Sequence, residues 1–141
     1  MLDPNKCFAI LGHVVTAMRS EEELNLLEWD IHYELGQLTD SDTRAECTRN
    51  TDYRQAWIKF DPSHCDTYEQ AYEACVHEVF HIVAAPLDVL WAGRSRTNEE
   101  EGRWHAGLEP LITKLERFYA RKFKKFEDFF TDEGDFKAEQ P

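Results

Sequence analysis

The 141 residues suffice for one domain of ordinary size with a single core. Apolar residues make up 42% of the chain and charged residues 31%, a composition that excludes intrinsic disorder. The formal net charge of -12 argues against nucleic acid and membrane partners, because clustered Lys and Arg bind both. The one basic stretch, 114–125, is followed at once by acidic residues, so we interpret it as a solvated helix face.

The cysteine pattern and the absence of hydrophobic targeting segments indicate a cytoplasmic protein. None of the four cysteines forms a C-x-x-C pair, and the residues after Met1 do not resemble a signal peptide. No apolar run approaches the ~20 residues that span a bilayer. We therefore expect a reducing environment and no insertion into a membrane.

The first expected element is a helix at about 4–18. Asp3 and Pro4 have the character of an N-cap and a first helical residue, and apolar residues then recur at helical spacing at Phe8, Leu11, Val15 and Met18. Ser20 and Glu23 repeat the capping-box spacing. A second short helical turn is therefore expected towards Leu27.

The next segment predicts a small, mainly antiparallel sheet. Apolar and polar residues alternate from Trp29 to Leu35, which indicates a strand with one buried face. A weaker strand is expected near Ala45 to Arg49, and a stronger one is formed by Ala56, Ile58 and Phe60. With the helices on either side, these strands predict an α+β fold.

Two further helices are expected in the second half of the chain. Asp66 and Glu69 have capping-box spacing and predict a long helix that ends before Pro86. Another helix is expected from about Thr97, with one apolar stripe formed by Trp104, Leu108, Leu111, Leu115 and Phe118. Pro110 lies inside this pattern and predicts a kink, or two helices that meet at an angle.

The strongest motif in the chain is the sequence His77-Glu78-Val79-Phe80-His81 on the first of these helices. Residues four apart lie on one helix face, so both imidazoles can reach one ion while Glu78 points beside it. The alternative is a core helix with two partly satisfied histidines. The apolar residues around the motif count against it, because burying these polar groups is costly without a metal.

With this motif, the chain resembles gluzincin-type zincins, and especially small metallopeptidases encoded by bacteriophages. The resemblance covers roughly Trp29 to Leu115, through the first strand, the segment from Tyr53 to Asp61, the H-E-x-x-H helix and a later Glu-rich helix. It implies a compact zincin-like fold. The length indicates a single domain over 1–141, and the acidic end from about 131 is expected to be flexible. The resemblance also implies Zn²⁺ as the cofactor and a peptide or protein as the substrate.

The resemblance implies His77 and His81 as zinc ligands, with a third ligand still to be assigned. The metzincin pattern is excluded, because Ala84 and Leu87 replace its glycine and its third ligand. Gluzincins take a Glu from a following helix, and three candidates begin that helix: Glu99, Glu100 and Glu101. Glu101 is favoured because it continues the apolar stripe, and Glu100, which also suits a capping box, comes next.

The activity implied by the resemblance is peptide-bond hydrolysis, with Glu78 as the general base on a zinc-bound water. His105 is a second candidate catalytic residue, which would stabilise the oxyanion, replace Glu101 as a ligand, or only pack. The alternative function is a zinc-stabilised, non-catalytic protein that binds or inhibits a host partner. The presence of Glu78 favours the enzyme.

Overall fold

The computed structural model describes residues 1–87, 97–122 and 125–137, and it has the expected α+β architecture. The first part contains helix α1 (Pro4–Ser20), a 3-10 turn (Glu22–Leu24) and the strands β1 (Asp30–Leu35), β2 (Ala45–Asn50) and β3 (Gln55–Phe60). A second 3-10 turn (Pro62–His64) precedes α2 (Tyr68–Val83), α4 (Asn98–Lys122) and the short α5 (Phe126–Phe129). Among the described helices, none combines the length and the apolar composition that crossing a membrane requires.

The three strands form a mixed sheet in the order β1-β3-β2, so the expectation of a mainly antiparallel sheet is wrong. β2 and β3 pair antiparallel as a hairpin, with Ala45 opposite Phe60 and Asn50 opposite Gln55. β1 joins the other side of β3 in parallel, with Leu35 also opposite Phe60. The parallel pair arises because β3 inserts between the two strands that precede it in the sequence.

The connection between β1 and β2 passes over the end of β3 and is fixed there by Asp61 and His64. The backbone N–H of Asp61 donates to the carbonyl of Arg44 at 2.9 Å, and its carboxylate accepts from the N–H of Leu38 at 2.9 Å. His64 Nδ1 lies 2.6 Å from the carbonyl oxygen of Thr43. These bonds hold residues 42–45 in place beside α2, where they form one wall of the candidate site.

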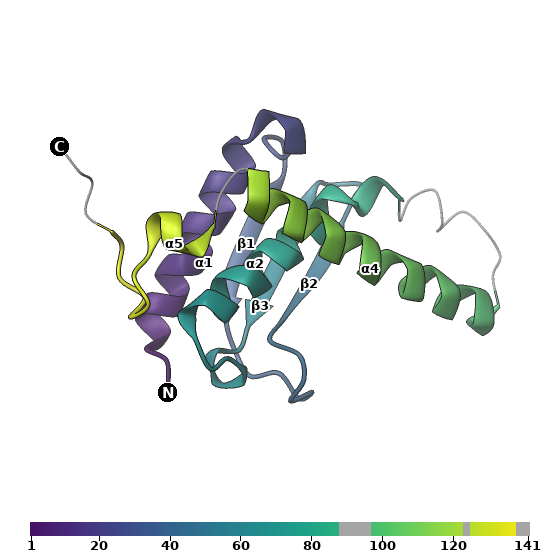
Figure 1. The fold of residues 1–141 in the computed structure, drawn as a ribbon. Helices are drawn as coiled ribbons and strands as arrows, with labels where there is room; N and C mark the ends of the chain where they lie inside the picture. The colour runs from purple at the N-terminus through teal and green to yellow at the C-terminus, as the bar shows by residue number, and fades with distance from the viewer. Residues whose placement is uncertain (88–96, 123–124, 138–141) are drawn as a thin grey trace.

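Helices α1 and α2 pack side by side over one face of the sheet (Figure 1). Asp3 caps α1 as expected, since its side chain accepts from the N–H of Asn5, and the helix extends to Ser20. The N-cap of α2 is Thr67, one residue after the expected Asp66. The core between the two helices and the sheet contains the fully buried side chains of Ile10, Leu11, Met18, Ile58, Phe60, Val79 and Ile82.

Helix α4 crosses α2 and extends past the sheet at one end (Figure 1). It is one helix of 25 residues with Pro110 inside it, and not two helices that meet at an angle. Pro110 lies in an exposed stretch, where water can replace the missing N–H donor. The expected apolar stripe is wrong in part, because Leu111 and Phe118 are 42% and 49% exposed, whereas Ile112 is buried.

The acidic end of the chain folds back through Lys137. Phe130 and Phe136 form an isolated β-bridge, and the N–H of Lys137 donates to the carbonyl of Phe129 at 2.8 Å. Lys6 on α1 contacts this turn through the carboxylate of Asp135, at 3.1 Å. In Figure 1 the segment accordingly runs beside α1, on the side of the molecule away from the free end of α4.

Candidate metal centre

Helix α2 presents both histidines of the motif on one face, one turn apart. Thr67 fixes the start of the helix, since its hydroxyl accepts from the N–H of Gln70 at 3.1 Å. The rings of His77 and His81 lie 5.1 Å apart, edge to face. Their side chains are 22% and 12% exposed, so both are partly buried and still accessible from solvent. The four-residue spacing therefore has the geometry that the sequence predicted.

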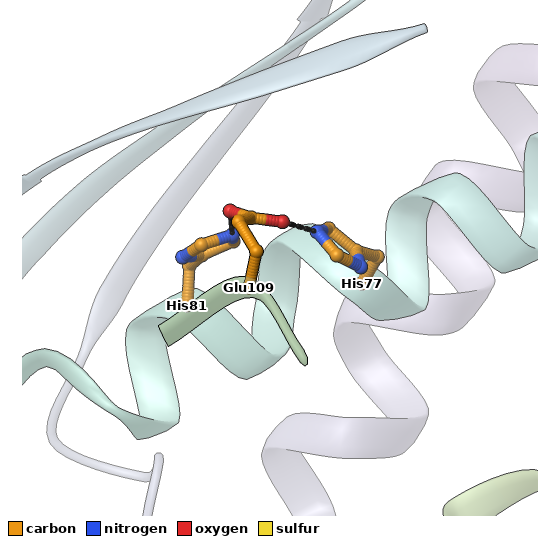
Figure 2. Close-up of side chains that lie close together, drawn as sticks. All are labelled: His77, His81 and Glu109. Carbon is orange, nitrogen blue, oxygen red and sulfur yellow. Dashed lines mark hydrogen bonds and ion pairs between the residues drawn. The ribbon is translucent and has the colours of Figure 1, made fainter. Parts of the chain in front are cut away.

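The third group at this position is Glu109 from α4. One carboxylate oxygen lies 3.1 Å from His77 Nε2 and the other 3.0 Å from His81 Nε2, so the carboxylate bridges the two rings (Figure 2). Each of the three residues offers one possible ligand atom, and these three atoms lie within 4.8 Å of one another. Tetrahedral zinc with bonds of about 2.0–2.1 Å separates its ligand atoms by about 3.3 Å, so these three residues fit such an ion.

Glu116 supports this arrangement through the other nitrogen of His77. Its Oε2 lies 3.1 Å from His77 Nδ1, and its side chain is only 21% exposed. A carboxylate that accepts from Nδ1 fixes the tautomer in which Nε2 carries the lone pair that a metal needs. Glu109 and Glu116 are seven residues apart on α4, so one helix face supplies both carboxylates.

The two histidines differ in pKa although both contact Glu109. A hydrogen bond to Glu116 has the largest effect on the pKa of His77 and, with the charges of Glu78 and Glu109, raises it against the opposing effect of burial. Burial has the largest effect on the pKa of His81 and lowers it, against the charge of Glu109. The lowered pKa favours the neutral form of His81. The raised pKa favours the protonated form of His77, which would have to lose its proton to bind a metal.

Among the described residues around the cluster, Glu78 is the buried carboxylate. It is 8% exposed, and burial raises its pKa to about 7, while the charge of His77 acts in the opposite direction. A carboxylate with a pKa near neutrality both accepts and returns a proton readily. Glu78 therefore has the properties of a general base, and it is not among the three residues grouped as possible ligands.

The cluster borders a cavity of about 500 Å³ that three separate parts of the chain enclose. One wall is formed by the loop 42–44 with the first residue of β2, the floor by α2, and the opposite wall by α4. The residues lining it are Asp42, Thr43, Arg44, Ala45, Glu73, Ala74, His77, Glu78, Glu109 and Glu116. A cavity of this volume can admit a small ligand, and Glu78 is among the residues that line it.

The structure groups Glu109 with the two histidines and does not group Glu100 or Glu101 with them. Glu101 lies eight residues before Glu109, about 12 Å along the helix axis. Glu100 instead takes the capping-box position, since its N–H donates to Thr97 Oγ1 at 3.2 Å. Glu99 pairs with Arg103 on the exposed start of α4.

The side chain of His105 lies outside the part of the chain that the structure describes, so its predicted role stays a prediction. Sequence reasoning missed Glu109 and Glu116. The signal that could have found them is their seven-residue spacing beside the buried residues Leu108 and Ile112, which places two carboxylates along one edge of an apolar stripe.

Comparisons of the chain with protein-family models, with curated proteins and with solved structures find no match. The functional assignment therefore depends on the chemistry of the side chains that α2 and α4 bring together.

Proposed function

We propose that the protein is a zinc-dependent hydrolase that cleaves peptide bonds. The observation that carries the proposal is the buried carboxylate of Glu78 next to a His77, His81 and Glu109 group, at the edge of a cavity. Two imidazoles and a carboxylate form the three-ligand set of catalytic zinc sites, which leave one position open. A structural zinc site would close that position with a fourth protein ligand.

The chemistry of the donor atoms supports zinc as the ion. Imidazole nitrogens suit zinc and other transition metals, whereas magnesium and calcium prefer sets made of oxygen atoms. His77 and His81 would bind through Nε2, because Glu109 lies beside both Nε2 atoms and Glu116 occupies Nδ1 of His77. When bound, zinc polarises a carbonyl group and lowers the pKa of the attacking water.

Glu78 would move the proton that amide hydrolysis requires. It would accept a proton from the attacking water and then deliver it to the leaving nitrogen, which must be protonated before it departs as an amine. Its pKa of about 7 supports both steps, because a stronger acid would be a poor acceptor and a weaker acid a poor donor. Glu116 would hold His77 in orientation while this occurs.

A peptide would reach this centre along the open side of β2. Within the described part of the chain, β2 pairs only with β3 and is an edge of the sheet, and its first residue, Ala45, lines the cavity. An extended peptide can add to such an edge through main-chain hydrogen bonds, with little dependence on its sequence. This mode of binding is consistent with a peptidase that acts on exposed or unfolded segments.

The test begins with the metal content of the purified protein and then compares Glu78→Gln with wild type. We expect one zinc per chain in both proteins, because Glu78 is not among the ligands. Both proteins and the exposed control Glu69→Gln are then incubated with a cell extract, and new protein termini are identified by mass spectrometry.

New termini with wild type and Glu69→Gln, but not with Glu78→Gln, would support the peptidase. If all three proteins retain zinc and capture the same partner without cleaving it, the site is that of a non-catalytic interaction protein. A protein that binds no zinc would exclude both functions.

A further inference from the structure

Helix α4 has three apolar side chains at seven-residue intervals on a surface that solvent reaches. Trp104, Leu111 and Phe118 follow one another by about two turns, so they form a line along the helix, the outer stripe. Leu111 and Phe118 are 42% and 49% exposed, and Trp104 is partly exposed. The side chains that α4 buries in the core form a separate line: Leu108, Ile112 and Tyr119.

The first ten residues of α4 contain little that would stabilise a helix by itself. No described side chain in 98–107 is buried, and this half of α4 extends past the sheet (Figure 1). A Cβ added at Gly102 or Gly107 would meet nothing within 4 Å beyond its own surroundings on the helix. Glycine lowers helix propensity, and short helices depend on packing of an apolar face. We therefore expect a partner to pack against this half of α4.

The charge of α4 changes sign near the middle of the helix, which indicates what kind of partner fits. Residues 98–109 contain four Glu and one Arg, a net charge of -3. Residues 110–121 contain Lys114, Arg117 and Arg121 with one Glu, a net charge of +2. A second α4 in the opposite direction would place each acidic half beside a basic half, whereas a parallel one would bring like charges together.

The outer stripe also has the symmetry that pairing with a second copy requires. Leu111 is the middle residue of the stripe and lies within one residue of the centre of α4. In an antiparallel pair centred there, Leu111 meets its own copy, and Trp104 meets Phe118 of the second copy, as in a two-fold interface. The same register brings Glu100 beside Arg121 of the second copy. The extended half of each helix then lies along the half that packs on α2 in the other copy.

We propose that the outer stripe is a docking surface for a second copy of this chain, in a two-fold dimer of antiparallel α4 helices. The general repulsion between two chains of net charge -12 is largely screened beyond ~8 Å at physiological ionic strength, whereas opposite charges at the interface lie closer. Glu109 is two residues from Leu111 and thus about 160° around the helix, so the dimer leaves the metal centre uncovered.

The first test measures the oligomeric state by analytical ultracentrifugation. We expect wild type to show a monomer–dimer equilibrium between ~1 and ~500 μM. Leu111→Glu should weaken the dimer at least ~30-fold, because the two-fold axis places two introduced carboxylates opposite each other. The matched control Leu27→Glu changes a leucine outside α4 that is 67% exposed, and it should dimerise like wild type. A cooperative urea transition checks that each variant is folded.

Charge reversal tests the pairing of the two halves of α4 in the same assay. Glu100→Arg and Arg121→Glu should each weaken the dimer about fivefold or more, since each places like charges together at both ends of the interface. The double variant restores opposite charges, so its affinity should return to within about twofold of wild type. A further loss in the double variant would overturn the antiparallel arrangement, whatever the cause of the single losses.

Disulfide formation tests the direction and register of the helices. Under mild oxidation Leu111→Cys should give a covalent dimer, because the two introduced cysteines meet on the two-fold axis. In Arg121→Cys the two positions are about 30 Å apart, so this variant should give only the background of wild type, which has the partly buried Cys47. A covalent dimer of Arg121→Cys above that background would indicate parallel helices and overturn the proposal. So would a wild type that stays monomeric up to ~500 μM, or a dimer that Leu111→Glu leaves intact.

Discussion

His77 Nδ1 and Glu116 Oε2 lie 3.1 Å apart, while Nε2 of the same ring lies 3.1 Å from Glu109. Two carboxylates of one helix thus contact both nitrogens of a single imidazole. Their backbone positions are about 10.5 Å apart along the axis of α4, so the two side chains converge on the ring. The crossing of α4 over α2 therefore fixes the position of His77 at two points.

The contact with Glu116 predicts a measurable effect on metal affinity. Glu116→Gln should weaken zinc binding about 10–100-fold, because the amide no longer holds the Nδ1 proton with a full negative charge. Competition with a chromophoric chelator measures the change, and circular dichroism checks the fold. The control Glu73→Gln removes a carboxylate from the floor of the same cavity and should leave the affinity within a few-fold of wild type. Equal losses in the two variants would contradict a specific role for Glu116.

The assignment of the third ligand predicts a ranking along α4. Glu109→Gln should lose more zinc affinity than Glu116→Gln, since it removes a ligand and not its support. Glu101→Gln and Glu100→Gln should bind zinc like wild type, because neither residue belongs to the group around the histidines. The same chelator competition ranks all four proteins. A loss in Glu101→Gln larger than that in Glu109→Gln would restore the ligand that the sequence favoured.

The histidine pair was predictable from sequence, whereas its acidic partner was not, for a physical reason. His77 and His81 are set by the local period of one helix, which the capping residue and the apolar pattern reveal. Glu109 depends on how a second helix crosses the first, and the sequence contains two overlapping apolar stripes. Both stripes include Leu108 and Leu115, and only packing against α2 selects the one that buries Ile112.

In the sheet, too, the positions of the strands could be predicted from local sequence patterns, whereas the order of the strands could not. Each strand was expected near its observed position, because alternation and β-branched or aromatic residues are local signals. The order of the strands depends on which one inserts between the others. The loop anchored by Asp61 and His64 turns over the end of β3 and leads to the far side, which makes β1 and β3 parallel.

The raised pKa of His77 predicts that zinc affinity falls on mild acidification. In the metal-free protein the hydrogen bond to Glu116 favours the imidazolium form, so a proton competes with the ion at pH values above the usual 6.5 of histidine. Below the pKa of His77, affinity should fall about tenfold for each pH unit. Calorimetric titrations between pH 5.5 and 8.5 would show the change. In Glu116→Gln the decline should begin at a lower pH, and an identical profile in both proteins would exclude Glu116 as the cause.

The burial of Glu78 predicts that its replacement stabilises the metal-free protein at high pH. Burial raises the pKa of Glu78 from the usual 4.5 to about 7, so the folded chain holds this proton more tightly than the unfolded chain does. The stability that Glu78 contributes is therefore complete below pH 4.5, declines between pH 4.5 and 7, and is lost above pH 7. Glutamine stays neutral and has nearly the same shape, so Glu78→Gln avoids the loss.

The expected size of the effect follows from the difference of about 2.5 pKa units, at 1.36 kcal/mol for each, which gives an upper bound of about 3 kcal/mol. Urea unfolding at pH 8 and pH 4, with a chelator present, measures the free energy of unfolding of both proteins. Glu78→Gln should be the more stable at pH 8 and equal to wild type at pH 4, while the exposed Glu69→Gln shows no such gain. If Glu78→Gln is instead the less stable at pH 8, the carboxylate must have a partner that offsets its burial, and its readiness to accept a proton would be lost.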